Sequence, residues 1–306
     1  MKIGNNDINK VKIGSTDINK VYIGSEQVWT NEVPSLLLDN LSGSTGAFSL
    51  RKLSSSYNGS AIQVRRASDN TTQDIGFVNN QLDTASLNTF CSGTDGFVTI
   101  WYNQSDTSNN LIQTTSSNQP KIYDSINGVE LENSIPCLKF NNNEFLIVDN
   151  SNFASLSTLK TIINVNKSKS TSVMALMAKG YFDSGEYMFY SFTKSGVTRH
   201  RYGIDGSYFF DLNNPTIYNV YSLTMFTFVN GLNGLKYFNN GQLHKEYDIL
   251  SNLNSNTNDK LVVGKSITYN TWYFTGSMQE ILLFSNDQTS NKTTIEDNIN
   301  TNYSIY

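Results

Sequence analysis

The sequence predicts an all-β fold, an antiparallel sandwich or jelly roll. From Ile62 onward, short runs of β-branched and aromatic residues alternate with Asn, Asp, Gly and Ser, a spacing typical of sandwiches. Turn sequences such as Asn230-Gly231 and Asn239-Asn240-Gly241 favour tight hairpins between these runs. No β–α–β alternation occurs, which argues against a parallel-sheet enzyme fold.

The first 29 residues repeat a short motif three times. Residues 2–11 read KIGNNDINKV, residues 12–21 read KIGSTDINKV, and a third copy decays into YIGSEQVW at 22–29. Each copy holds four to six strand-like residues and a Gly-containing turn. A ribbon this small buries no core of its own, so it needs a partner surface.

Two interpretations of this repeat segment stay open. It is either a β-meander packed on its own domain or an anchor that attaches the chain to sister copies or to an assembly. The apolar residues expected to form the anchor are Ile3, Ile8, Val11, Ile13, Ile18, Val21, Ile23, Val28 and Trp29.

Pro34 ends any ladder that would continue from the repeats, so we divide the chain into a repeat segment at 1–30, a linker at 31–45 and a sandwich at 46–306. Helices are expected at 47–53 and near 290–300. The strongest strand candidates are 97–102, 159–166, 173–178, 187–192, 221–229, 235–238, 261–263 and 279–284.

Composition excludes several classes of protein. Charged residues make up 16% of the chain and the net charge is −4, without the basic stripe of a nucleic-acid binder. No apolar run is long enough to span a membrane, and residues 1–15 lack the pattern of a secretory signal. Cys91 and Cys137 are expected to be two buried thiols, although the sequence alone does not establish whether they pair.

A series of motifs follows the linker: AFSLRKL at 47–53, SYNG at 56–59, VRRASD at 64–69, TQDIGF at 72–77, LDT at 82–84, TFC at 89–91, FVTIWYNQS at 97–105 and QPKI at 119–122. With these motifs the block from Ala47 to Gln113 resembles the opening of the catalytic domain of the arabinofuranosidase B family, whose fold is a concanavalin A-like β-sandwich. The same block recurs in phage and prophage proteins that end in a laminin G-like sandwich, and the N-terminal repeat resembles segments of phage structural proteins.

The departures from that family concern catalysis. The resemblance implies a Glu nucleophile in the middle of the sandwich, yet residues 202–212 offer only Asp205 and Asp211. It implies an Asp acid near the C-terminal end, where this chain has Lys265. In the family signature Trp-Tyr-Asp-Gln-Ser-Gly, this chain has Asn103 in place of the Asp and Asp106 in place of the Gly. Because glycoside hydrolysis needs two carboxylates, these departures predict a protein that is not an enzyme.

The best local candidate for glycan contact is a turn between large rings near the C-terminal end. Tyr269, Asn270, Trp272 and Tyr273 combine rings that stack on sugars with an amide that binds hydroxyl groups. The alternative is that Trp272 and Tyr273 are buried. Arg199 and Asp205 form a second polar candidate. Glu280 is expected to serve strand pairing, and Trp101 and Tyr102 are expected to be core residues.

From these patterns we expect a phage virion protein of fibre, decoration or adhesin type, displayed on the particle exterior. Its sandwich would be of the concanavalin A or laminin G type. Its expected partners are other virion proteins, further copies in a homotrimer, and host-surface polysaccharide, with no nucleic acid and no membrane insertion. No cofactor is predicted, although calcium at a loop rim stays an alternative. Two rival functions are a glycoside hydrolase or depolymerase of the arabinofuranosidase type with relocated carboxylates, and a structural spacer without a ligand.

Overall fold

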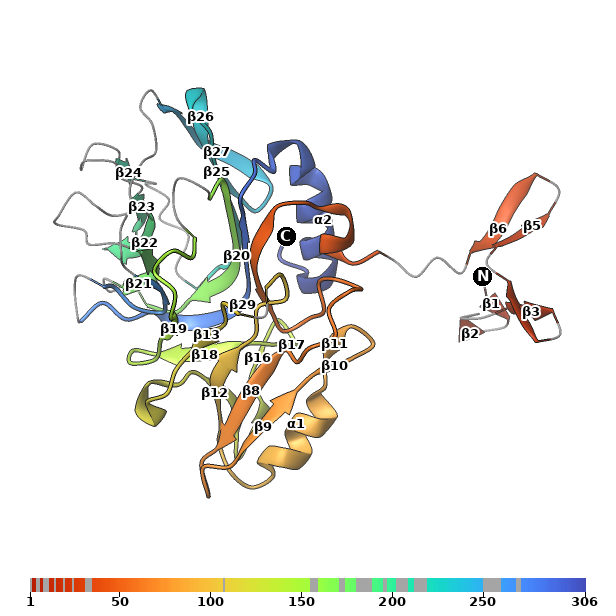
Figure 1. Cartoon of the computed structure of the whole chain (residues 1–306), viewed down its shortest axis with the longest axis horizontal. Helices are drawn as coiled ribbons and strands as arrows, with labels where there is room; N and C mark the ends of the chain where they lie inside the picture. Colours follow the sequence, from red (N-terminus) through yellow and green to blue (C-terminus); the bar gives the residue numbers. More distant parts are fainter. Residues whose placement is uncertain are drawn as a thin grey trace.

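The chain forms a β-sandwich of two sheets that three small hairpins precede (Figure 1). The pairings that build both sheets are antiparallel. This confirms the predicted antiparallel all-β fold. The computed structural model describes residues 2–3, 6–7, 11–13, 15–18, 20–23, 25–30, 35–106, 108–154, 159–170, 174–179, 189–194, 197–201, 209–211, 219–249, 260–267 and 271–306.

Each copy of the N-terminal repeat contributes one antiparallel hairpin. In the second copy Val11 pairs with Ile18, and the same register sets Lys12 opposite Asp17. Two residues, Gly-Asn or Gly-Ser, separate the innermost pair in each copy, and Gly first suits a two-residue hairpin turn. The strands are β1 (Lys2–Ile3), β2 (Asn6–Asp7), β3 (Val11–Ile13), β4 (Thr16–Ile18), β5 (Lys20–Ile23) and β6 (Glu26–Thr30).

The first sheet of the sandwich combines strands of the resemblance block with strands from the middle of the chain and with β28 near its C-terminal end. Its strands are, in spatial order, β9 (Thr72–Ile75), β8 (Ile62–Arg66), β12 (Gly96–Trp101), β13 (Leu111–Ile112), β19 (Leu146–Val148), β28 (Leu261–Val263), β21 (Met174–Lys179), β22 (Phe189–Lys194), β23 (Val197–Arg201) and β24 (Phe209–Asp211).

The second sheet has the long strand β29 at its centre. One half of β29 pairs with β7 and the other half with β18, while β20 pairs along its whole length. A pairing between β14 and β12 joins the two sheets at one edge. The strands are β27 (Gln242–Ile249), β26 (Gly231–Asn239), β25 (Tyr221–Phe228), β20 (Thr161–Ser168), β29 (Thr275–Phe284), β7 (Ser44–Ser49), β18 (Leu138–Asn141), β14 (Lys121–Asp124) and β15 (Gly128–Val129).

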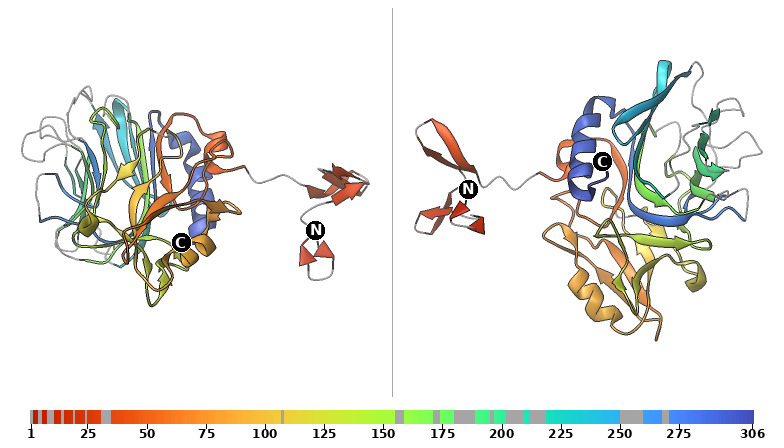
Figure 2. Two further views of the ribbon diagram at one scale, coloured as in Figure 1. Left: turned by 60° about the horizontal axis from the view of Figure 1, so that its bottom comes forward. Right: turned by 180° about the vertical axis from the view of Figure 1, so that it is seen from behind.

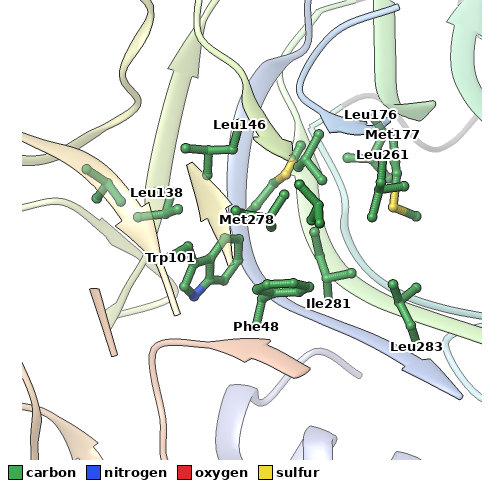
Figure 3. Close-up of a cluster of buried hydrophobic side chains, with 14 of the residues drawn as sticks. Phe48, Trp101, Leu138, Leu146, Leu176, Met177, Leu261, Met278, Ile281 and Leu283 are labelled. Atoms are coloured by element: carbon green, nitrogen blue, oxygen red, sulfur yellow. The ribbon is translucent and has the colours of Figure 1, made fainter. Parts of the chain in front are cut away.

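The main hydrophobic core lies between the two sheets (Figure 3). Phe48 of β7 meets Trp101 of β12 edge to face, with ring centroids 6.2 Å apart. Met278 and Ile281 of β29 complete this part of the core. Trp101 is therefore a core residue, as predicted. Tyr102 is only half-buried and its hydroxyl donates to Asp74 Oδ1 at 2.9 Å, so its prediction as a core residue is wrong.

The C-terminal helix covers the outer face of the second sheet (Figure 2). Ile295, Ile299 and Tyr303 pack against side chains of β7, β20, β25 and β29, and Leu37 joins them from the other end of the chain. The central strands β20, β25 and β29 of the second sheet are thus buried on both faces. The helices are η1 (Leu37–Asn40), α1 (Thr84–Cys91), η2 (Ser116–Asn118), η3 (Thr289–Asn291) and α2 (Lys292–Tyr303), and short ladders join β10 (Phe77–Val78) to β11 (Gln81–Leu82) and β16 (Leu131–Glu132) to β17 (Ile135–Pro136).

Most predicted elements are confirmed, and one is wrong. The helix expected at 47–53 is strand β7 followed by irregular chain, because Phe48 and Leu50 face the core while Ala47 faces α2. This alternation has the period of a strand. The helix α2 confirms the second prediction. Helix α1 was not predicted, although Asp83 caps it by accepting from Ser86 N at 3.0 Å.

Candidate functional site

The first sheet carries a row of apolar side chains on its outer face, the face turned away from the core. In the core, Val263 of β28 pairs with Leu146 of β19. One residue earlier on β28, Val262 pairs with Ile147 and with Ala178 of β21. Since successive residues of a strand point to opposite faces, these three lie on the outer face.

Trp272 lies over this row. It packs together with Ile267 against Ala175 and Ala178, two small buried residues of β21. The indole is half-buried, and the Trp272 carbonyl accepts from Ser266 N at 2.9 Å. The small side chains beneath allow the indole to lie close to the sheet. This arrangement fixes a broad aromatic surface on the outer face.

A second group of aromatic residues lies beside Trp272. Tyr273 and Phe145 are half-buried, with ring centroids 6.4 Å apart and planes inclined by 46°. The Lys265 ammonium lies over both rings, 5.0 Å from the centroid of Phe145 and 5.2 Å from that of Tyr273. The backbone bridge between Lys265 and Tyr273 places the two side chains next to each other.

Gly264 is the residue that lets the chain turn into this group. Its φ of +93° lies in the region that favours glycine, and its N–H donates to Leu176 O at 2.8 Å. A Cβ at this position would lie 2.7 Å from Phe140 Cε1 and 2.8 Å from Glu144 O. The position of Lys265 therefore depends on a glycine before it.

The structure brings together some of the predicted glycan-contact residues. Trp272 and Tyr273 are adjacent and both half-buried, so the alternative that they are fully buried is not what the structure has. Arg199 lies on β23, in a register row that runs from Ala175 through Phe192 and Arg199 to Asp211. Tyr269, Asn270 and Asp205 lie outside the described residues.

Two residues of this region were missed as contact candidates. Phe145 begins the alternating run Phe145-Leu146-Ile147-Val148, whose odd members face outward, and this alternation was the signal that could have found it. Lys265 was considered only as the residue that replaces an acid. Its contacts with two rings depend on the backbone bridge to Tyr273 and on the pairing of β19 with β28, which no local pattern shows.

The well-buried carboxylates of the described chain have structural partners. Arg51 binds both carboxylate oxygens of Glu280, at 2.8 and 3.0 Å, which confirms Glu280 as part of strand pairing and core. Glu132 accepts from Lys167 Nζ at 2.8 Å and Ser277 Oγ at 2.9 Å. Burial alone would raise the pKa of Glu132. The hydrogen bonds outweigh this effect and lower the pKa to about 2. Neither group is placed as a catalytic acid.

The signature around residue 103 holds the scaffold together. Asn103 Oδ1 accepts from Ala47 N at 2.8 Å and from Ser105 N at 3.0 Å, and Asn103 Nδ2 donates to Thr45 O at 3.2 Å. Gln104 likewise binds the backbone of 49–53. In this chain the Asn of the signature therefore joins β7 to the end of β12.

Across the described ranges, no three His, Cys, Asp or Glu side chains gather where they could hold a metal ion. None of the helices in these ranges is both long enough and apolar enough to cross a membrane. Cys91 and Cys137 are buried free thiols, as predicted.

Comparisons with known proteins relate this fold to arabinofuranosidases. The family model described as Alpha-L-arabinofuranosidase B, catalytic, matches residues 42–135. An arabinofuranosidase complexed with arabinofuranosyl-α-1,2-xylobiose is similar over 84% of this chain, with 15% identity and a TM-score of 0.64. A mutant GH54 α-L-arabinofuranosidase soaked with 4-nitrophenyl α-L-arabinofuranoside gives 16% identity over the same share, with a TM-score of 0.66.

The likeness at this level of identity shows the fold. The chain spans 62% of the length of both of these structures. None of the curated proteins compared with the chain matches it. The predicted resemblance to the arabinofuranosidase B catalytic domain is therefore confirmed for the sandwich.

The comparisons contradict the predicted function. The family model and the solved structures described above are of arabinofuranosidases, so the prediction of a phage virion structural protein is wrong, and so is the prediction that the chain is not an enzyme. The alternative of a glycoside hydrolase is better supported. Part of the error came from Asn103, which was counted against catalysis although it is a buried scaffold residue.

Proposed function

We propose that the sandwich is a concanavalin A-like glycoside hydrolase domain that acts on α-L-arabinofuranosides. The observation that carries this proposal is the arabinofuranosidase B match at residues 42–135, which covers β8, β9, β12 and β13 of the first sheet and β7, β14 and β15 of the second. The substrate class is taken from the related structures, which hold arabinofuranosyl ligands.

The proposed substrate site is the outer face around β28, β21 and the strands beyond them. The outer face of the second sheet is covered by α2, so a glycan has no access there. On the first sheet, Trp272 and Tyr273 present rings that would stack against the C–H faces of a sugar. Tyr269, Asn270 and Arg199 are proposed to bind its hydroxyl groups.

The proposed chemistry uses two carboxylates, one as acid and one as nucleophile or base. We assign these roles to Asp205 and Asp211, the carboxylates of the stretch 202–212 in which the family resemblance implies the nucleophile. The backbone of Asp211 lies opposite that of Arg199 in the β23–β24 ladder.

The test is release of 4-nitrophenol from 4-nitrophenyl α-L-arabinofuranoside by the full chain. Asp205→Asn and Asp211→Asn are each expected to lower kcat by about 10³-fold or more, because loss of a catalytic group removes transition-state stabilisation. The matched control is Asp149→Asn, an exposed carboxylate at the end of β19, which should leave kcat within about twofold. Full activity in both site variants, or no release by the parent chain, would reject the proposal.

We also propose that the N-terminal hairpins attach the chain to further copies of itself. Among the described residues each hairpin pairs only within itself, which leaves strand edges that readily accept another strand. Solution mass should then fall from an oligomer to a monomer when residues 1–34 are deleted. A full-length monomer, or an oligomer that persists in the 35–306 fragment, would contradict this role.

A further inference from the structure

Lys265 is a half-buried cation whose charge has no carboxylate partner in the part of the chain that the structure describes. Its ammonium contacts the rings of Phe145 and Tyr273, 5.0 and 5.2 Å from their centroids. A cation over an aromatic ring is attracted by the ring's negative face, which holds Lys265 in one orientation. The rings orient the charge but do not neutralise it.

Two other lysines also lie over an aromatic ring, but each of them is paired with a carboxylate as well. Lys121 lies over Phe97 and also binds Asp95 and Asp124, at 2.8 and 3.2 Å. Lys292 lies over Phe238 and also pairs with Glu296. In both cases a carboxylate completes the surroundings of the ammonium. At Lys265 the position of that carboxylate is not taken by any described side chain.

The carboxylate closest to this group in the sequence is already engaged. Glu144 precedes Phe145, and its Oε2 accepts from Asn141 N at 2.5 Å and from Asn143 N at 3.1 Å. It therefore caps the turn at 141–143. Glu144 does not contribute an ion pair to Lys265, so the positive charge faces the outer surface beside Tyr273.

We propose that Lys265 binds the carboxylate of an acidic sugar, so that the preferred glycan carries a uronic acid beside its arabinofuranosyl unit. This inference rests on the proposed function for the placement of the glycan against Trp272 and Tyr273. Tyr273 is bound to Lys265 through a backbone bridge and adjoins Trp272, so stacking and charge recognition would act on neighbouring sugars. A carboxylate there would form a charge-assisted hydrogen bond with an ammonium that is already oriented.

The experiment compares two glycans that differ in one group. One is an arabinofuranosyl oligosaccharide that carries a glucuronic acid, and the other is the same compound after reduction of its carboxyl group to an alcohol. Calorimetry uses the full chain with Asp211→Asn in every protein compared, so that no glycan is cleaved. It should give about fivefold to tenfold tighter binding of the acidic glycan at low ionic strength, and added salt should reduce the ratio.

Variants assign that preference to Lys265. Lys265→Met keeps the length of the side chain and should bind both glycans equally, whereas Lys265→Arg should keep the preference. The matched control is Lys260→Met, which removes an exposed lysine that pairs with Asp149. A preference that survives Lys265→Met, or equal binding of both glycans by the parent chain, would overturn the inference.

The two proposals fail in different ways. Binding is measured without bond cleavage, so a Lys265-dependent preference without hydrolysis would leave this inference standing and reject the proposed activity. Equal binding of both glycans together with Asp211-dependent hydrolysis would reject this inference and leave the proposed activity standing. Thermal unfolding of each variant separates loss of binding from loss of the fold.

Discussion

Arg51 and Glu280 form a buried two-pronged ion pair that joins the beginning of the sandwich to its last strand. Arg51 Nε and Nη2 donate to the two Glu280 oxygens at 2.8 and 3.0 Å, and the Glu280 carboxylate is fully buried. Tyr303 of α2 adds its hydroxyl at 3.0 Å. Burial alone would lower the pKa of Arg51, yet the charge of Glu280 raises it above its ordinary value.

Removal of one partner of this pair should destabilise the chain strongly. Arg51→Met is expected to lower the free energy of unfolding by about 3–5 kcal/mol, because it leaves the Glu280 charge buried without its partner. Urea denaturation of both proteins measures the difference. In the double variant Arg51→Met, Glu280→Met the loss should be smaller than in either single variant. Additive losses would show that the two residues act independently.

The sequence predicted the fold where alternation was strong. Strand β28 was predicted with its observed bounds, and the run at 279–284 lies within β29. The segment at 47–53 failed because Ala47, Leu50 and Leu53 are good helix formers, whereas pairing with β29 and burial on two faces decide its structure. The helix propensity of a short segment carries no information about its pairing with a strand far away in the sequence.

The candidate site could be predicted only in part. Trp272 and Tyr273 were found because large rings beside polar turn residues are visible in the sequence. Phe145 and Lys265 belong to the same group, but Phe145 reaches it through the pairing of β19 with β28, which are more than a hundred residues apart in the chain, and Lys265 through its bridge to Tyr273. Asn103 was misjudged since a buried amide that binds backbone cannot be told from a catalytic position by sequence alone.

Asn103 provides a second prediction. Replacement by Asp, the family residue, keeps the acceptor for Ala47 N but removes the donor to Thr45 O and places a carboxylate oxygen near that carbonyl. The change should cost about 1–3 kcal/mol of unfolding free energy. The same change at exposed Asn58 should cost less than about 0.5 kcal/mol. Equal stability of the two variants in urea denaturation would refute the scaffold role of Asn103.

The cysteines should be unreactive while the chain is folded. Burial raises the pKa of Cys91 to about 11 and that of Cys137 to about 12, so neither is a thiolate at pH 8. A thiol reagent such as 5,5′-dithiobis(2-nitrobenzoate) should label neither residue in native buffer and both in guanidinium chloride. Thr89→Cys, at an exposed position on the same helix as Cys91, is the positive control. Rapid labelling of the parent chain would contradict the buried placement.

Glu132 should make part of the stability depend on pH. Its pKa is lowered to about 2 in the folded chain, against an ordinary value of 4.5, because Lys167, Lys169 and Ser277 hydrogen-bond to its carboxylate. As the pH falls, the Glu132 carboxylate is therefore protonated in the unfolded chain before it is protonated in the folded chain. The stabilisation is fully present above pH 4.5 and is lost as the pH falls toward 2.

Comparison of the parent chain with Glu132→Gln isolates this contribution from those of other carboxylates. At pH 6 the variant should be less stable, by at most about 3 kcal/mol, because three lysines lose their shared partner. The difference in unfolding free energy should shrink steadily between pH 4.5 and pH 2. The exposed variant Asp149→Asn should show no such trend. If the gap between parent and Glu132→Gln stayed constant over this range, the ion pairs around Glu132 would not be what holds β16, β18 and β20 together.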